Sequence, residues 1–336
     1  MTSGDVITTL EVDVDNRGLS RRTFLRGAAG VTASVAAAGA LEAASPTPAL
    51  AANNGFGLTI VESGVVDHRL QWYRFSTPEI GWNPAINVLL PDGYHTSGKR
   101  YPVLYLLHGG AQDFRWWHLE GDVYNATAWK DLIVVMPDGG TAGWYCNPVA
   151  SITGPRNWES FHINQVIPWI DANFRTFPEY DGRAVAGFSM GGFGALKYTA
   201  KYYGHFCAVT SFSGPASLRR DGGAVVHWMQ TTATVDLGVP GGLYGIPWDE
   251  ARVSADNPVE RIPSYHNKRV AFYAGTDPND IQEARVLAGC REFSAALHQA
   301  GIPHHYVEHP GGHGWNIQAH LHAEIPAILD RLRRAA

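Results

Sequence analysis

A serine between two glycines is the residue of this sequence best suited to covalent chemistry. Residues 187–191 read Gly-Phe-Ser-Met-Gly, with an apolar run at 184–186 before them and a helix-forming run at 194–203 after them. This is the strand-turn-helix pattern of a nucleophile elbow. A serine in so tight a turn brings backbone too close for side chains at the flanking positions, which are therefore glycine. We predict that Ser189 is a nucleophile and that the N–H of Met190 faces its oxyanion.

A serine hydroxyl needs a base that accepts its proton, and imidazole is the usual one. His313 lies in the stretch Pro-Gly-Gly-His-Gly-Trp (310–315), beyond the last expected strand at 304–308. The chain order nucleophile, acid, histidine places a catalytic base there. Further histidines surround it, and a metal site is the alternative for them: His304, His305, His309, His320 and His322. We expect no metal, because no His-x-x-x-His helix pair or matching carboxylate spacing appears.

Three carboxylates are candidates for the acid that orients the histidine. Asp277 directly follows the expected strand at 269–274, where the acid of such a triad generally lies, and Asp280 and Glu283 come a few residues later. Each is also suited to capping a helix or to its first turn. The residues alone leave this choice open.

A second backbone donor for the oxyanion is expected after another strand. The continuous apolar run at 101–107 ends in His108-Gly109-Gly110-Ala111. A glycine pair directly after a central strand is where that donor lies in the hydrolases that carry a nucleophile elbow.

The apolar runs predict the fold that positions these residues. Continuous apolar runs indicate strands buried on both faces, as in a parallel sheet covered by helices on each side. They occupy residues 101–107, 132–136, 184–186, 208–212 and 269–274, and helical patterns occupy 158–174, 194–203, 283–300 and 319–334. Residues 58–90 read as antiparallel strands at one edge. We predict a doubly wound, mostly parallel sheet, with residues 215–262 as an excursion over the site.

Composition excludes several classes of protein. The 336 residues are 45% hydrophobic and 17% charged, with a formal net charge of -5, which gives no electrostatic reason to expect nucleic acid as a partner. The three cysteines, at unrelated spacings, indicate neither a disulfide framework nor a zinc site: Cys146, Cys207 and Cys290.

The N-terminal stretch has the pattern of an export signal. Residues 20–26 read Ser-Arg-Arg-Thr-Phe-Leu-Arg, a weakly apolar stretch of small residues covers 27–44, and Ala49-Leu50-Ala51 is suited to cleavage. We predict a twin-arginine signal peptide at 1–51 and one domain at 52–336. The protein is then secreted or held in the cell envelope, with no stable membrane insertion after signal removal.

Five motifs in order resemble the esterase D and antigen 85 (mycolyltransferase) branch of the α/β-hydrolases. They lie at 108–113, 136–140, 158–171, 187–192 and 310–315, and the similarity covers nearly all of 55–330. The resemblance implies the α/β-hydrolase fold, with Ser189 as nucleophile and His313 as base. It also implies that backbone N–H groups of Met190 and of Gly110 or Ala111 hold the oxyanion.

The resemblance also bears on the acid. In the antigen 85 branch the acid is a glutamate on the helix after the strand, which corresponds to Glu283. In the feruloyl esterase branch it is an aspartate in a Gly-Thr-x-Asp loop, which points to Asp277. This sequence has Gly-Thr-Asp-Pro, one residue short of that pattern. The resemblance thus favours Glu283 and keeps Asp277 as the alternative.

The expected function is that of an exported serine esterase without a cofactor. Acyl transfer to a sugar hydroxyl is the rival, because it uses the same residues, and a secreted binding protein that has lost catalysis is a second alternative. The substrate is expected to be a small-molecule, glycan or lipid ester, and the sequence leaves the oligomeric state open. Aromatic residues near the motifs are candidates for binding it: Trp116, Trp117, Trp144 and Trp315.

Overall fold

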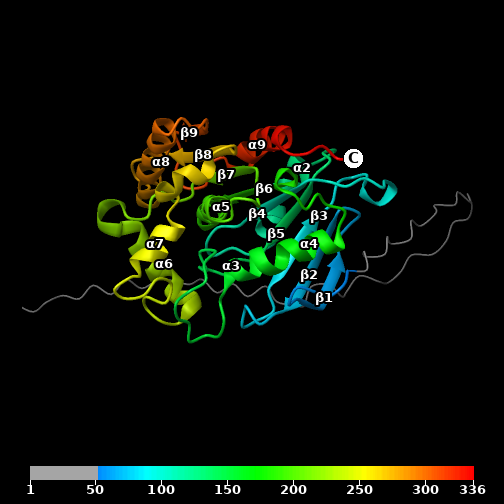
Figure 1. Ribbon diagram of the computed structural model, residues 1–336, viewed down its shortest axis with the longest axis horizontal. Coiled ribbons are helices and arrows are strands. Elements are labelled where there is room, and N and C mark those ends of the chain that lie inside the picture. Colours follow the sequence, from blue (N-terminus) through cyan, green and yellow to red (C-terminus); the bar gives the residue numbers. More distant parts are fainter. Residues whose placement is uncertain (1–51) are drawn as a thin grey trace, which may run out of the picture. The chain divides into compact units, whose positions relative to one another are not determined.

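The computed structural model describes residues 52–336, so the predicted signal peptide and its cleavage site lie outside the described residues. Within them, one nine-stranded sheet has the order β1-β2-β3-β5-β4-β6-β7-β8-β9 (Figure 1). The strands are β1 (Thr59–Val65), β2 (Leu70–Ser76), β3 (Ala85–Leu89), β4 (Val103–Leu107), β5 (Ile133–Pro137), β6 (Arg183–Phe188), β7 (Ala208–Phe212), β8 (Arg269–Gly275) and β9 (His305–His309).

The pairing of the strands divides the sheet into two parts. β1, β2, β3 and β5 pair antiparallel, and every pair from β5 through β4 to β9 is parallel. The parallel strands at the centre are buried on both faces, as their continuous apolar sequences require. The predicted doubly wound sheet with antiparallel N-terminal edge strands is therefore confirmed.

Helices cover both faces of the sheet. They are α1 (Trp116–Leu119), α2 (Val123–Ala126), α3 (Trp158–Ser160), α4 (Ile167–Asn173), α5 (Met190–Lys201), α6 (Arg220–Leu237), α7 (Glu250–Asp256), α8 (Ile281–Gln299) and α9 (Ile317–Arg331). Buried side chains of α1, α2 and α9 pack on one face, and those of α3 to α8 pack on the other. Because β4 to β9 run parallel, their carboxyl ends meet at one edge of the sheet.

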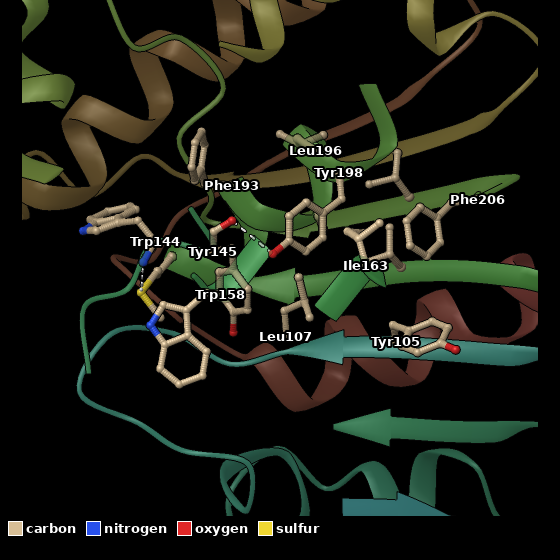
Figure 2. Close-up of a cluster of buried hydrophobic side chains, with 14 of the residues drawn as sticks. Tyr105, Leu107, Trp144, Tyr145, Trp158, Ile163, Phe193, Leu196, Tyr198 and Phe206 are labelled. Atoms are coloured by element: carbon tan, nitrogen blue, oxygen red, sulfur yellow. Dashed lines mark hydrogen bonds between the residues drawn. The ribbon is translucent and has the colours of Figure 1, made fainter. Parts of the chain in front are cut away.

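An aromatic core lies between the sheet and α5 (Figure 2). Tyr198 of α5 donates its hydroxyl hydrogen to the carbonyl oxygen of Tyr145 at 3.0 Å, and the Tyr145 hydroxyl donates to the carbonyl oxygen of His108 at 2.9 Å. The rings of Tyr145 and Tyr198 are perpendicular, with their centroids 6.2 Å apart. This core therefore joins α5 to the turn at 143–146 and to the loop that follows β4.

The expected helix at 158–174 is interrupted. A π-helical turn, Phe161–Val166, separates α3 from α4, and Pro168 follows directly within the first turn of α4. Proline has no N–H to donate to the carbonyl four residues earlier, and its ring needs room there, so the backbone widens before it. The hydrophobic periodicity could not reveal this, because the same face stays buried across the interruption.

Residues 215–262 contain α6, α7 and the start of a 3₁₀ stretch, Pro258–Tyr265. This agrees with the expectation of a partly helical segment outside the strand-helix alternation. In the part of the chain that the structure describes, no helix is both long enough and apolar enough to cross a bilayer.

Candidate active site

Ser189 occupies a strained turn between β6 and α5. Its φ of 53° and ψ of -116° lie outside the regions that most residues adopt. A Cβ on Gly187 would lie 2.2 Å from the carbonyl oxygen of Gly191, and one on Gly191 would lie 2.3 Å from that of Leu107. Both positions therefore require glycine, for the reason that the sequence pattern suggests. The turn places Ser189 at the carboxyl edge of the sheet, directly before the first residue of α5.

The structure brings His313 and Glu283 to this serine. The Ser189 hydroxyl oxygen lies 2.8 Å from Nε2 of His313, and Nδ1 of the same ring lies 2.6 Å from Oε2 of Glu283. An ionised carboxylate only accepts hydrogen bonds, so Nδ1 carries the proton and Nε2 presents its lone pair to the serine. The three residues thus form a continuous relay of hydrogen bonds from β6, α8 and the loop after β9.

Glu283 is fully buried and its other oxygen is also bonded. Oε1 accepts hydrogen bonds from the Ser213 hydroxyl at 2.9 Å and from the Gly275 amide at 2.6 Å. These donors offset the loss of hydration that a buried carboxylate suffers and hold its plane toward the histidine. The carboxylate of Glu283 is therefore fixed before any substrate arrives.

The other two candidate carboxylates have different partners. Asp280 caps α8 by accepting from the Glu283 amide at 2.9 Å and also accepts from the His313 amide at 2.7 Å. Burial by itself would raise the pKa of Asp280, but these backbone hydrogen bonds outweigh it and the pKa lies below its usual value. Asp277 accepts from the Asn279 amide at 2.9 Å and forms no bond to the histidine ring. The structure brings Glu283, and not Asp277, to His313.

The loop after β4 lines the same place, and its backbone N–H groups differ in their partners. The Ala111 amide donates to the carbonyl oxygen of Thr141 at 2.8 Å and is thereby occupied, while the Gly109 amide donates to Oε1 of Gln112 at 2.7 Å. Gly110 and Met190 both line the pocket beside Ser189. Of the two loop residues predicted as donors, Gly110 rather than Ala111 has an amide that no carbonyl within the described residues engages.

The side chain of His108 holds this loop in place through two hydrogen bonds. Its ring is buried, donates from Nδ1 to the carbonyl oxygen of Gly109 at 2.8 Å and accepts at Nε2 from the Gly139 amide at 2.8 Å. One imidazole thus ties the loop after β4 to the loop after β5. The two loops that flank the serine cannot move apart without breaking these bonds.

A cavity of about 470 Å³ opens above Ser189. It is lined by Gly110, Ala111, Gln112, Thr141, Ala142, Trp144, Phe188, Ser189, Met190, Trp228, Thr232, Val235, Gln282 and His313. Three of these, Trp228, Thr232 and Val235, lie on α6 at the i, i+4, i+7 spacing of one helix face. The side of α6 that faces the cavity is thus a wall of the site.

α6 is held to the rest of the site by specific bonds. The indole N–H of Trp144 donates to the Thr232 hydroxyl at 2.9 Å, and the Ala142 amide donates to Oδ2 of Asp236 at 2.7 Å. Burial raises the pKa of the Asp236 carboxyl above its usual value. These contacts connect α6 to the loop after β5 that forms the opposite part of the wall.

The four tryptophans predicted to bind substrate lie in different surroundings. Trp144 lines the cavity. Trp116 is stacked on Phe188, with the ring centroids 5.4 Å apart, and Trp315 is stacked on His309 at 5.2 Å. Trp117 is 1% exposed and donates its indole N–H to the carbonyl oxygen of Leu107. Of the four, the structure brings only Trp144 to the cavity, because the others pack against neighbouring side chains or the sheet.

Within residues 52–336 no group of three or more histidine, cysteine, aspartate or glutamate side chains is placed to hold a metal ion. The His309 ring is stacked on Trp315, and the His320 ring is tilted against both, so these histidine rings pack among aromatic neighbours. The three cysteines are buried and unpaired.

Sequence reasoning missed several residues of the site. Gln282 lies next to a candidate acid, and Ser213 follows the predicted strand at 208–212, so their positions along the chain were available signals. The cavity face of α6 shows a helical spacing inside a segment that we predicted only as an excursion. Nothing in the sequence alone indicates which face of that helix meets the serine.

Comparison with known proteins gives three relevant findings. The family model described as "Putative esterase" matches residues 77–329. Esterase Rv1288 of Mycobacterium tuberculosis is 60% identical over 294 residues, which cover 84% of this chain and 64% of that protein. The MPT51/MPB51 antigen of Mycobacterium bovis is 26% identical over 265 residues, which cover 70% of this chain and 84% of the antigen. The chain thus spans slightly less than two thirds of its 60% identical relative.

Among solved structures, an S-formylglutathione hydrolase from Agrobacterium tumefaciens superposes with a TM-score of 0.67. The two chains share 16% sequence identity, and the match covers 82% of this chain and 99% of the hydrolase. At that identity the likeness concerns the fold alone. It confirms the predicted α/β-hydrolase fold.

Proposed function

The chain belongs to the esterase family of α/β-hydrolases, with relatives in the antigen 85 branch, and from this premise we propose that it is a serine esterase that acts through an acyl-serine. The observation that carries the proposal is the hydrogen-bonded order Ser189, His313, Glu283, with distances of 2.8 and 2.6 Å. A hydroxyl, an imidazole lone pair and a buried carboxylate in this order are the parts that nucleophilic acyl transfer needs.

In the first half of the reaction, the Ser189 oxygen attacks the ester carbonyl carbon and Nε2 of His313 takes the hydroxyl proton. Glu283 stabilises the imidazolium that results, because its carboxylate lies against Nδ1–H. The tetrahedral intermediate then collapses, the bond to the alcohol oxygen breaks, and His313 gives its proton to that oxygen. The acyl group remains bound to Ser189.

The backbone N–H groups of Met190 and Gly110 are the proposed oxyanion donors. Met190 is the first residue of α5, so its amide has no acceptor within the helix and adds the favourable field of the helix N-terminus. Gly110 lies on the loop that His108 holds in place. Donors fixed in advance lower the barrier without reorganising during the reaction.

The cavity lining supports an ester with an apolar group next to the scissile bond. Trp144, Phe188, Trp228 and Val235 supply apolar walls, and Val235 is 73% exposed at the outer part. Exposed apolar side chains at the rim of a pocket favour a ligand that extends beyond it. We therefore place the substrate among small-molecule or lipid-like esters.

Export by the twin-arginine route is part of the same proposal. It is supported by the Ser-Arg-Arg-Thr-Phe-Leu-Arg sequence at 20–26 and by the small-residue stretch that follows. Both lie outside the described residues.

The test is a burst experiment on the full chain with p-nitrophenyl acetate, butyrate and a long-chain ester. We expect a burst of p-nitrophenol followed by slower turnover, and we expect Ser189→Ala to abolish both. Ser63→Ala, which makes the same change at an exposed position of the edge strand β1, is the matched control and should keep the burst.

A burst that survives in Ser189→Ala contradicts the proposal. Absence of a burst on all three esters, with no labelling by a serine-directed phosphonate, favours a binding protein instead. Release that is faster with trehalose or glucose, with a sugar ester as product, identifies acyl transfer in place of hydrolysis.

A further inference from the structure

Gln282 faces the reacting nitrogen of His313. Its side-chain Nε2 lies 3.0 Å from Nε2 of the imidazole, the same atom that the Ser189 hydroxyl approaches to 2.8 Å. Gln282 is half-buried and lines the cavity. The family model and the relatives assign no role to it.

Two donors thus meet one acceptor. Because Nδ1 of His313 carries the ring proton and donates a hydrogen bond to Glu283, Nε2 has a single lone pair. The amide of Gln282 and the hydroxyl of Ser189 both point at this lone pair, and only one of them can form a full hydrogen bond to it at a time. No other side-chain hydrogen bond of Gln282 forms within the described residues.

The chain geometry places Gln282 there firmly. It lies in the first turn of α8, between Asp280, which caps the helix and binds the His313 amide, and Glu283, which binds the His313 ring. The same helix turn therefore orients the His313 ring and places the side-chain amide of Gln282 beside Nε2 of that ring. These two neighbours fix the backbone of this turn relative to His313, within reach of the Gln282 amide.

The conflict between the two donors disappears once Ser189 is acylated. The serine then has no hydroxyl hydrogen, and the lone pair of Nε2 is available to the next nucleophile. We propose that Gln282 is a positioning residue for that nucleophile: its amide N–H binds the oxygen of the incoming water or alcohol while the nucleophile donates its own hydrogen to Nε2. This inference rests on the acyl-serine reaction proposed above.

The second half of the reaction then balances as follows. The nucleophile oxygen forms a bond to the acyl carbon, and its O–H proton moves to Nε2 of His313. The tetrahedral intermediate collapses with cleavage of the bond between the acyl carbon and the Ser189 oxygen, which takes the proton back from Nε2. Gln282 forms and breaks hydrogen bonds only, and aims a lone pair of the nucleophile at the carbonyl carbon.

This role predicts an effect on one half of the reaction. His313 serves as base in both halves, so a residue that merely supports the ring would slow acylation and deacylation together. Gln282 binds the oxygen of the second nucleophile, and the leaving alcohol oxygen occupies the same position in the first half. Because p-nitrophenolate departs with little assistance, loss of Gln282 should slow deacylation alone when the substrate is a p-nitrophenyl ester.

The test uses the full chain and p-nitrophenyl acetate in stopped flow, with Gln282→Met, which keeps the length of the side chain and removes its donor. We expect the rate of the burst to stay within about twofold and steady-state turnover to fall about tenfold, the loss of one hydrogen bond to a reacting group. Gln299→Met at the other end of α8, where the side chain is exposed, is the matched control and should change neither rate. Gln282→Glu also removes the donor at constant size and should slow the same step at pH 8.

Equal losses in both phases, or no loss in either, overturn the role of Gln282. These results leave the esterase proposal intact, because that proposal fails only if the parent protein shows no burst or if Ser189→Ala keeps one. Thermal unfolding of the Gln282 variants detects a folding defect. Steady-state turnover is then divided by the burst amplitude, which counts the active molecules, and is compared with the burst rate of the same sample.

Discussion

Glu283 and Asp277 both follow β8, yet the fold gives them different surroundings. Glu283 is fully buried with four hydrogen-bond contacts supplied by His313, Ser213, Gly275 and, through its own amide, Asp280. Asp277 is partly exposed and bonds to its own turn. An acid that orients an imidazole must be hydrogen-bonded to the ring and held in place, and of these two residues only Glu283 is.

Glu283→Gln should therefore lower kcat about 10³- to 10⁴-fold, because an amide neither fixes the Nδ1–H tautomer nor stabilises the imidazolium. Asp277→Asn is the matched control and should keep kcat within about twofold, as expected for an exposed turn residue. Steady-state hydrolysis of p-nitrophenyl butyrate by both variants measures the difference. A larger loss in Asp277→Asn than in Glu283→Gln would transfer the role of the acid to Asp277.

At the scale of elements, α5 directly follows Ser189 and is anchored by buried charges. Nζ of Lys197 in α5 lies 2.6 Å from Oε2 of Glu159 in α3 and 3.3 Å from Oδ2 of Asp256 in α7. Lys201 adds a contact to Glu159 at 2.8 Å. Removing one partner of such a buried set leaves an uncompensated charge, so the network fixes α5 against both neighbours.

Glu159 should make stability depend on acid pH. Burial by itself would raise its pKa, but the charges of Lys197 and Lys201 outweigh burial and lower it from 4.5 to about 2. A carboxyl with a lowered folded-state pKa stabilises the fold above its unfolded value, and this contribution is lost as the pH falls from about 4.5 toward 2. Glu159→Gln should lower the free energy of unfolding by about 3 kcal/mol at pH 7 and by less at pH 3.

Urea unfolding at the two pH values measures this change. The exposed pair of Glu62 with Arg74, at 3.1 Å, supplies the control, because Glu62→Gln should cost less than about 1 kcal/mol at either pH. If Glu159→Gln lowers the free energy of unfolding equally at pH 7 and pH 3, the charge of the Glu159 carboxylate is not what stabilises the fold.

At the scale of the whole molecule, the proposed catalytic domain and the proposed export signal are separate in sequence. The elements that build the site begin after residue 52, whereas the two arginines of the proposed signal are Arg21 and Arg22. A receptor that reads the arginine pair should therefore control location without affecting catalysis.

Replacing Arg21 and Arg22 together by Lys should retain the protein in the cytoplasm with unchanged specific activity. Arg26→Lys, outside the pair, is the control and should be exported normally. Esterase activity and immunoblots of cell fractions measure the outcome. Export of the double variant at the level of the parent would exclude the twin-arginine route.

Local patterns were sufficient to predict much of this protein. The apolar runs predicted the parallel centre of the sheet, because a strand buried on both faces has no polar alternation. The glycines around Ser189 predicted the elbow. A Cβ at Gly187 or Gly191 would lie only 2.2 or 2.3 Å from a backbone oxygen, which excludes any side chain there. Such features depend on a few neighbouring residues and are therefore visible in one sequence.

Other features depend on which distant segments meet, and only the tertiary structure decided them. The Ala111 amide is occupied because the loop after β5 brings Thr141 to it. Trp117 is buried because α1 packs on β4. The face of α6 that lines the cavity beside Ser189 is the one that carries Trp228. The sequence by itself determined the strand that precedes Ser189 and the likeness to a family, and it predicted the candidate nucleophile and base. The choice among neighbouring carboxylates, amides and aromatic rings followed from packing, because burial and hydrogen-bond partners are properties of the folded chain.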